Sequence, residues 1–196
     1  MKKFSQRMNS VHALNSDDLV FLFNGLFSKQ YHIRLEGDHD EPLYSPNAGK
    51  NGEHLLAFRE DYFSSALHEI AHWCQAGEQR RTLEDFGYEY VPSDVRTPEI
   101  QGQFYVVEVI PQSLECLFTL ACGVSFNVSV DNFSVLSEER QIFLKNVVKQ
   151  ALVYWQQGGL PLRAKQWIEC LQAHYQTPSS LIEGWLLEKQ ELACEQ

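Results

Sequence analysis

The sequence predicts an α+β fold: a single, mostly helical domain with a small sheet. Its 196 residues are 44% hydrophobic and include twelve Phe, eight Tyr and four Trp, enough apolar surface for one sizeable core. Apolar residues recur at helical spacing in most segments, whereas only short stretches have the composition of strands. Residues 1–14 are polar. We therefore expect a flexible N-terminus there, followed by one domain over residues 15–196.

The first elements expected are a helix and two strands. Asn15 or Ser16 can cap a helix, and the two aspartates that follow suit the positive end of its dipole. Residues 31–35 alternate as in a short strand, and residues 54–58 form an apolar strand of the central kind. Between the two strands we expect an acidic turn over residues 36–44. The inward stripe of the first helix is expected to be Leu19, Leu22, Phe23, Leu26 and Phe27.

Residues 62–76 are the segment around which the rest of the chain is organised. No Gly or Pro interrupts them, and their apolar residues keep helical spacing. Ser64 or Ser65 can cap the start of this helix, and Gly77 is placed to end it. The segment is therefore predicted to be an uninterrupted helix.

This helix carries the pattern His68-Glu69-x-x-His72. With about 3.6 residues per turn, positions i and i+4 differ by only about 40° around a helix, so both imidazoles leave one face. They can converge on a single metal ion. Glu69 points about 100° away from His68 and flanks the ion without needing to bind it. The pattern predicts a zincin-like metal-binding helix.

A third metal ligand is expected beyond the next loop. Residues 78–98 predict an ordered loop with a short strand, whose aromatic side chains either wall a pocket or pack over the core. Thr97-Pro98-Glu99 is a helix start, and we expect this helix to kink near Pro111. Glu108 lies in an apolar run of this helix, where a carboxylate costs free energy unless it is paired or bound to a cation. Glu108 is therefore the best candidate for the third ligand.

The rest of the chain is predicted to be mainly helical and structural. Residues 126–133 form a loop or a short strand. Ser137 caps an amphipathic helix that Gly158-Gly159 ends. A further helix covers residues 162–175, and Thr177-Pro178 starts a short last one. The inward face of the helix that follows Ser137 is expected to be Ile142, Phe143, Val147, Ala151, Leu152 and Trp155.

Composition excludes several classes of function. The net charge of −10 leaves no basic patch of the kind that binds nucleic acid. Five scattered cysteines without a C-x-x-C pair indicate neither a disulfide framework nor a thiolate zinc site, and they suit a reducing cytosol. Neither a signal peptide nor an 18-residue apolar run is present in the sequence. We therefore expect a cytoplasmic protein that acts without nucleic acid or membrane.

Two imidazoles and one carboxylate leave coordination positions open, as in a catalytic rather than a structural metal site. With zinc, Glu69 would be the general base that activates water, as in a peptidase of the HExxH type. With iron(II), the same three groups form the 2-His-1-carboxylate face of a non-haem oxygenase. Spacing alone does not choose between these chemistries, and a non-catalytic interaction domain with a relic site is a third possibility.

Several short blocks add to the metal pattern and cover nearly the whole chain after about residue 20. They are Asp40-Glu41-Pro42-Leu43-Tyr44, His68-Glu69-Ile70-Ala71-His72-Trp73-Cys74 with Ala76-Gly77, Arg80-Arg81, Asp85-Phe86-Gly87-Tyr88, Gln103-Phe104, Val107-Glu108-Val109 with Pro111-Gln112, Phe126-Asn127-Val128-Ser129 with Asp131-Asn132, and His174-Tyr175 with Thr177-Pro178. On these blocks the sequence resembles the bacterial elongation factor P hydroxylases. Most of them are not generic metal-site residues, so the resemblance is more specific than HExxH alone.

The resemblance implies a protein-lysine hydroxylase, an oxidoreductase of the monooxygenase type. Its implied substrate is a lysine of elongation factor P that already carries a β-lysyl group, and the modification supports translation. Molecular oxygen is the implied co-substrate. His68, His72 and Glu108 fall on the family's metal ligands. The expected cofactor is a divalent metal, iron(II), with zinc as the alternative, and the other reading of the site remains the zinc peptidase.

The acidic turn offers a binding site for such a substrate. A lysine that bears a further lysyl group carries two or more ammonium charges on a long tail. Carboxylates near its path can offset the desolvation of those charges through charge-assisted hydrogen bonds. Asp40 and Glu41 are the candidates, because the turn stiffened by Pro42 can hold them at a pocket mouth. Glu69 is the candidate near the metal itself.

Overall fold

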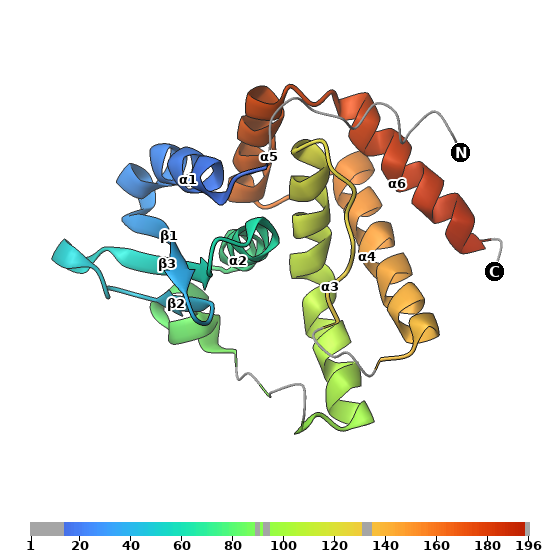
Figure 1. The fold of residues 1–196 in the computed structure, drawn as a ribbon, viewed down its shortest axis with the longest axis horizontal. Helices are drawn as coiled ribbons and strands as arrows, with labels where there is room; N and C mark the ends of the chain where they lie inside the picture. Colours follow the sequence, from blue (N-terminus) through green and yellow to red (C-terminus); the bar gives the residue numbers. More distant parts are fainter. Residues whose placement is uncertain (1–13, 89–90, 92–94, 131–134, 195–196) are drawn as a thin grey trace. The chain divides into compact units, whose positions relative to one another are not determined.

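The computed structural model of the protein describes residues 14–88, 91, 95–130 and 135–194. Within these residues the chain forms six α-helices, three short 3₁₀ turns and one three-stranded sheet (Figure 1). The α+β, mostly helical prediction is confirmed. The described chain divides into two compact units, a sheet unit of the residues up to 88 and a helical unit of the residues from 91 onward. The prediction of one hydroxylase domain over residues 15–196 stays a prediction.

The sheet unit consists of α1 (Ser16–Tyr31), β1 (Ile33–His39), β2 (Leu43–Ser45), β3 (His54–Arg59) and α2 (Phe63–Gln75). The strand order is β1-β3-β2, with β3 parallel to β1 and antiparallel to β2. The prediction that the third of these strands is central is therefore confirmed. Helix α1 packs along β1 and α2 along β3 (Figure 1).

The beginning of the sheet unit differs from the prediction in three ways. Tyr31 still belongs to α1, because the left-handed His32 (φ 49°) ends the helix and β1 starts only at Ile33. Two thirds of the predicted acidic turn is strand, since β1 extends to His39 and β2 occupies residues 43–45. The stripe of α1 is narrower than expected: Leu26 is 36% exposed, whereas Leu19, Phe23 and Phe27 are buried.

Two asparagine side chains satisfy backbone groups, one at the start of α1 and one on the neighbouring strand β1. The Asn15 side chain accepts a hydrogen bond from the backbone N–H of Asp17, which confirms the predicted cap. Asn24 of α1 makes the pair of backbone hydrogen bonds with β1 that a neighbouring strand would otherwise make. Its Oδ1 accepts from the Leu35 N–H at 2.8 Å, and its Nδ2 donates to the Leu35 carbonyl at 3.1 Å. This pair of bonds satisfies backbone groups on an edge strand.

The helical unit consists of α3 (Pro98–Ala121), α4 (Ser137–Gln157), α5 (Leu162–Tyr175) and α6 (Ser179–Cys194). Helix α3 begins at the predicted Thr97 cap and runs through Pro111 as one element. Its length and apolar composition would allow it to cross a membrane, but its most apolar stretch is 61% buried, as in the core helix of a soluble protein. The first turns of α3 and α4 lie side by side (Figure 1).

Three predictions for the helical unit are corrected. Ser137 is the first residue of α4 rather than its cap, and the capping position is Leu136, without a side-chain bond. Ile142 is 58% exposed, because its neighbour Phe143 occupies the inward position instead. The last helix, α6, is 16 residues long and not short.

Residues 126–130 link α3 to α4 in an extended manner without pairing as a strand. Side chains 126, 128 and 130 are buried and alternate with exposed ones. Side chains, not a neighbouring strand, hold three consecutive carbonyls: Arg140 donates to Val128 at 3.0 Å, Gln112 to Ser129 at 2.8 Å, and Gln101 to Val130 at 3.2 Å. Residues 131–133 of the predicted loop or strand lie outside the described chain.

Candidate metal centre

Helix α2 holds the two histidines because its other side is fixed in the core. Ile70 and Cys74, which are buried, project from α2 roughly opposite the histidines. Trp73 lies against Phe23 and Phe27 of α1, with ring centroids 5.1 and 4.9 Å away. The predicted Ser64 or Ser65 cap is wrong: both serines lie inside the helix, which starts after Tyr62. Ser65 instead accepts a hydrogen bond from the Arg59 N–H.

The two imidazoles are spaced as ligands of one ion. The Nε2 atoms of His68 and His72 lie 3.1 Å apart, and the ring planes cross at 72°. Two nitrogens at about 2.1 Å from one metal ion are separated by about 3.0 Å at a right angle and by about 3.4 Å at the tetrahedral angle. The observed distance falls between these values. Without the ion, the two nitrogens can share one hydrogen, as the tautomers allow.

Aromatic rings surround His72 on two sides. The Phe86 ring lies parallel to the imidazole, at 8° and 6.5 Å between centroids, and the Tyr88 ring meets it edge-on at 5.7 Å. Phe86 also stacks on Tyr44 of β2, with ring centroids 4.1 Å apart. The sequence left open whether the aromatics after residue 78 wall a pocket or pack over the core. Phe86 and Tyr88 flank a predicted ligand, and no strand is present in the described part of that segment.

The backbone that presents Phe86 is strained. Asp85, Phe86 and Gly87 have φ values of 44°, 57° and 72°, in a region that costs a bulky residue about 1–3 kcal/mol. Hydrogen bonds hold this conformation: the Asp85 carboxylate accepts from the Tyr44 N–H at 2.8 Å, and the Tyr44 hydroxyl donates to the Arg81 carbonyl. Strain of this kind persists only where neighbouring contacts impose it, and it concentrates at functional sites.

Arg81 connects this loop to the end of α2. Its Nη1 donates to the carbonyl of Ala76 at 2.8 Å. That carbonyl is one of those that a helix leaves without a partner at its C-terminus. The predicted end of the helix near Gly77 is therefore confirmed. The residue that terminates it is Ala76, whose backbone is extended, and Arg81 supplies a donor for the Ala76 carbonyl.

Glu108 lies on α3, in the helical unit. It is 7% exposed, and its Oε2 accepts a hydrogen bond from Nε2 of Gln112 at 3.2 Å. No role for Gln112 was predicted from the sequence, although its spacing of four residues from Glu108 is a signal for a pair on one helix face. The sequence predicted a carboxylate in apolar surroundings whose burial must be offset by a partner, and the hydrogen bond from Gln112 is such a partner.

The remaining predicted site residues have different surroundings. Glu69 is half-buried on α2. Asp40 and Glu41 are exposed in the link between β1 and β2. A cavity of about 500 Å³ in the same unit is lined by Glu36 and Asp38 among others, and neither Asp40 nor Glu41 belongs to that lining. The substrate-binding prediction for Asp40 and Glu41 therefore stays a prediction.

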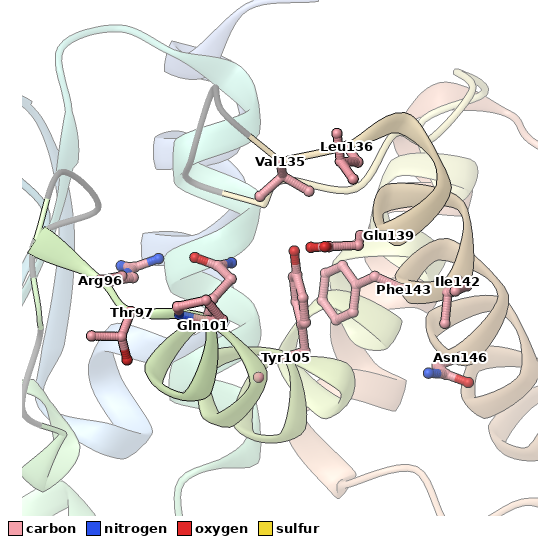
Figure 2. A pocket seen from close by; sticks show the side chains of 12 residues that line it. Arg96, Thr97, Gln101, Tyr105, Val135, Leu136, Glu139, Ile142, Phe143 and Asn146 are labelled. Atoms are coloured by element: carbon pink, nitrogen blue, oxygen red, sulfur yellow. The ribbon is translucent and has the colours of Figure 1, made fainter.

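A second cavity, of about 440 Å³, lies in the helical unit between the first turns of α3 and α4. Figure 2 shows Tyr105 beside Phe143, with its hydroxyl directed at the Glu139 carboxylate. Burial raises the pKa of the Tyr105 phenol above its usual value. None of the predicted site residues lines this cavity.

Comparison with known proteins identifies the family. The family model described as elongation factor P hydroxylase matches residues 22–184. A protein of Haemophilus influenzae, an elongation factor P lysine hydroxylase, is 40% identical over 165 residues, which cover 84% of this chain and 92% of that protein. These matches confirm the resemblance and the prediction of a protein-lysine hydroxylase enzyme. The chain belongs to the elongation factor P hydroxylase family.

Proposed function

We propose that the protein is an iron(II)-dependent hydroxylase of the β-lysylated lysine of elongation factor P. The observation that carries the metal dependence is the 3.1 Å separation of the His68 and His72 Nε2 atoms on one helix face, which suits adjacent positions around one ion. The substrate rests on the family and on the name of the Haemophilus influenzae relative. The reaction takes place in the cytoplasm, without nucleic acid or membrane.

The proposed ligands are His68, His72 and Glu108, with α2 as a zincin-like metal-binding helix. All three are residue types that ligate metals: His68 and His72 leave one face of α2, and Glu108 is a buried carboxylate of α3. Two neutral imidazoles and one carboxylate match the facial set of non-haem iron oxygenases and leave positions open for reactants. Bound iron(II) supplies the activation of molecular oxygen that hydroxylation requires. Zinc fits the same donors and is the alternative metal.

The chain's own residues orient the histidines and receive the substrate. Phe86 and Tyr88 limit the positions that the His72 ring can take. Rings on two sides also keep water from much of the imidazole, which strengthens electrostatic interactions there. Glu69 extends from the same helix as the histidines and can accept a hydrogen bond from a substrate ammonium. Asp40 and Glu41 attract the cationic tail from further away.

The proposal is tested with protein purified under anaerobic conditions, whose metal content is measured before any reaction. The iron(II)-loaded protein is then mixed with β-lysylated elongation factor P, air and a chemical reductant. Mass spectrometry of the modified peptide is expected to show the gain of one oxygen atom. Elongation factor P without the β-lysyl group is the matched control and should gain little. Hydrolysis of casein by the zinc-loaded protein, with no oxygen gain in the iron-loaded protein, would support the zinc peptidase instead.

A further inference from the structure

The buried amide of Gln112 has one well-defined orientation. Its side chain is completely buried on α3. Oε1 accepts from the Ser129 N–H at 3.1 Å, while Nε2 donates to the Ser129 carbonyl at 2.8 Å and to Glu108 Oε2 at 3.2 Å. The amide has two N–H donors, and each has an acceptor here. Turning the amide over would place its oxygen against two acceptors and its NH₂ against a donor, so this orientation alone satisfies the site.

The backbone that holds Gln112 is itself anchored on both sides. Ser129 lies between Val128 and Val130, whose side chains are 3% and 7% exposed. Their carbonyls accept from Arg140 at 3.0 Å and from Gln101 at 3.2 Å. The Ser129 backbone therefore cannot follow Gln112 if that side chain moves. As a consequence, the Gln112 amide is a fixed donor aimed at a buried carboxylate.

We propose that Gln112 is a positioning residue that sets the orientation of the Glu108 carboxylate for metal binding. This inference rests on the proposed function, in which Glu108 is a ligand. A buried carboxylate that can rotate loses conformational freedom when it binds an ion, whereas one already held by a hydrogen bond loses less. Outer partners of metal ligands typically contribute about 10–100-fold to metal affinity. Gln112 acts through Glu108 and does not itself touch the ion.

Gln101 provides a matched control on the same helix. It is also a buried glutamine of α3, 5% exposed, and its Nε2 also donates to the carbonyl of the extended segment, at Val130. Gln101 lies seven residues before Glu108, about two helical turns away. Replacing either glutamine therefore removes a bond to the same segment, whereas the bond to Glu108 that the inference concerns comes from Gln112.

The experiment compares Gln112→Met with Gln101→Met, because methionine has nearly the same shape as glutamine without its polar atoms. Cobalt(II) is titrated into the metal-free full-length protein, and both the dissociation constant and the visible absorption spectrum are recorded. Gln112→Met is expected to weaken cobalt binding by about 10–100-fold and to change the spectrum. Gln101→Met is expected to bind cobalt as the wild type does. Thermal unfolding of the metal-free proteins reports the stability lost with the bond to the extended segment, and both variants should be destabilised.

Two further variants separate the possible results. Gln112→Asn keeps an amide that is too short to reach both Ser129 and Glu108, so it should also weaken cobalt binding even where Gln112→Met does not fold. Wild-type cobalt affinity in Gln112→Asn or Gln112→Met would overturn the inference, as would equal weakening in the Gln101 variant. Glu108→Ala is measured in parallel. If Glu108→Ala loses affinity while the Gln112 variants do not, the inference alone fails; if Glu108→Ala binds normally, the proposed ligand set fails with it.

Discussion

The Nε2 atoms of His68 and His72 lie 3.1 Å apart, one helical turn from each other on α2. Removing either imidazole leaves at most two protein ligands of the proposed three, so His68→Ala and His72→Ala should each lose most bound metal. Metal content of anaerobically purified protein and far-UV circular dichroism are the measurements. The control is His174→Ala, since His174 is exposed near the end of α5. Wild-type metal occupancy in either test variant would contradict the assignment.

Glu69→Gln distinguishes the two chemistries that the HExxH pattern allows. In a peptidase, this change keeps the metal but removes the base, so hydrolysis should fall by several orders of magnitude. In a hydroxylase, no base is needed to activate water, so metal content and oxygen uptake should persist, with a raised KM if Glu69 holds a substrate ammonium. Glu78→Gln, just beyond α2 and exposed, is the control. Casein cleavage that disappears in Glu69→Gln, without oxygen uptake, would exclude the hydroxylase.

Asp40→Asn combined with Glu41→Gln tests the acidic link between β1 and β2. Both residues are exposed, and exposed ion pairs contribute about 0.2–1 kcal/mol, so KM for the β-lysylated factor should rise by up to about five-fold. Metal content should not change. Added salt should weaken the wild type more than the variant, because screening acts only on charges that are still present.

The matched control for the acidic link is Glu183→Gln with Glu188→Gln. It removes the same number of exposed charges from α6. It should leave both KM and the salt dependence as in the wild type. If the Asp40/Glu41 variant behaves in the same way, these two residues take no part in substrate binding.

Gly87→Ala should destabilise the fold more than Gly77→Ala. Gly87 has a φ of 72°, and an added Cβ would lie 2.9 Å from Cδ1 of Leu83. Leu83 is exposed and can move, so the main cost is the left-handed backbone, about 1–2 kcal/mol. Gly77 has no atom within 4 Å of an added Cβ, and its replacement should be neutral or slightly stabilising. Urea unfolding measures both, and equal midpoints would show that the left-handed backbone at Gly87 does not disfavour a side chain there.

His54 should make stability depend on pH. Burial, then Arg81 and then His32 lower the pKa of His54 below its usual value, and Nδ1 accepts from the Asn47 N–H at 3.2 Å. The unfolded chain therefore binds the proton more readily. The stability that the neutral ring contributes is fully present above about pH 6.5, the unfolded pKa, and is lost as pH falls through the folded pKa. His54→Asn should lose less stability between pH 7.5 and 5 than the wild type. If the urea midpoint falls by the same amount between these two pH values in both proteins, the prediction is wrong.

Periodicity predicted the helices well because each buries one apolar face. The same patterns could not place single side chains, as Ile142 and Phe143 show. These two residues are adjacent and both apolar, and only the packing of α4 decides that Phe143 is buried while Ile142 is 58% exposed. Strand β2 was missed for a related reason. It is three residues long, and its Tyr44 is held by Phe86 and Asp85, more than 40 residues later in the chain.

For the candidate site, the spacing of His68 and His72 was sufficient, because helix geometry alone brings their imidazoles together. The burial of Glu108 could be predicted from its apolar surroundings, while its role as a ligand stays a prediction. Phe86 could be placed only with the structure, since its position beside His72 depends on a left-handed turn and on contacts with β2. The spacing of Gln112 from Glu108 was visible in the sequence, but its other partner, Ser129, was not, because Ser129 lies in a segment without regular structure.

The way in which residues 126–130 are held has a consequence for the protein's behaviour at high concentration. An extended stretch with alternating apolar residues can add a strand from a second molecule, which is how aggregation often begins. Successive carbonyls of an extended chain point to opposite edges, and here those of Val128, Ser129 and Val130 are occupied by Arg140, Gln112 and Gln101. Neither edge of the segment offers these acceptors to another chain. The same glutamine that donates to Glu108 therefore also occupies the Ser129 carbonyl, one of the acceptors that an added strand would use.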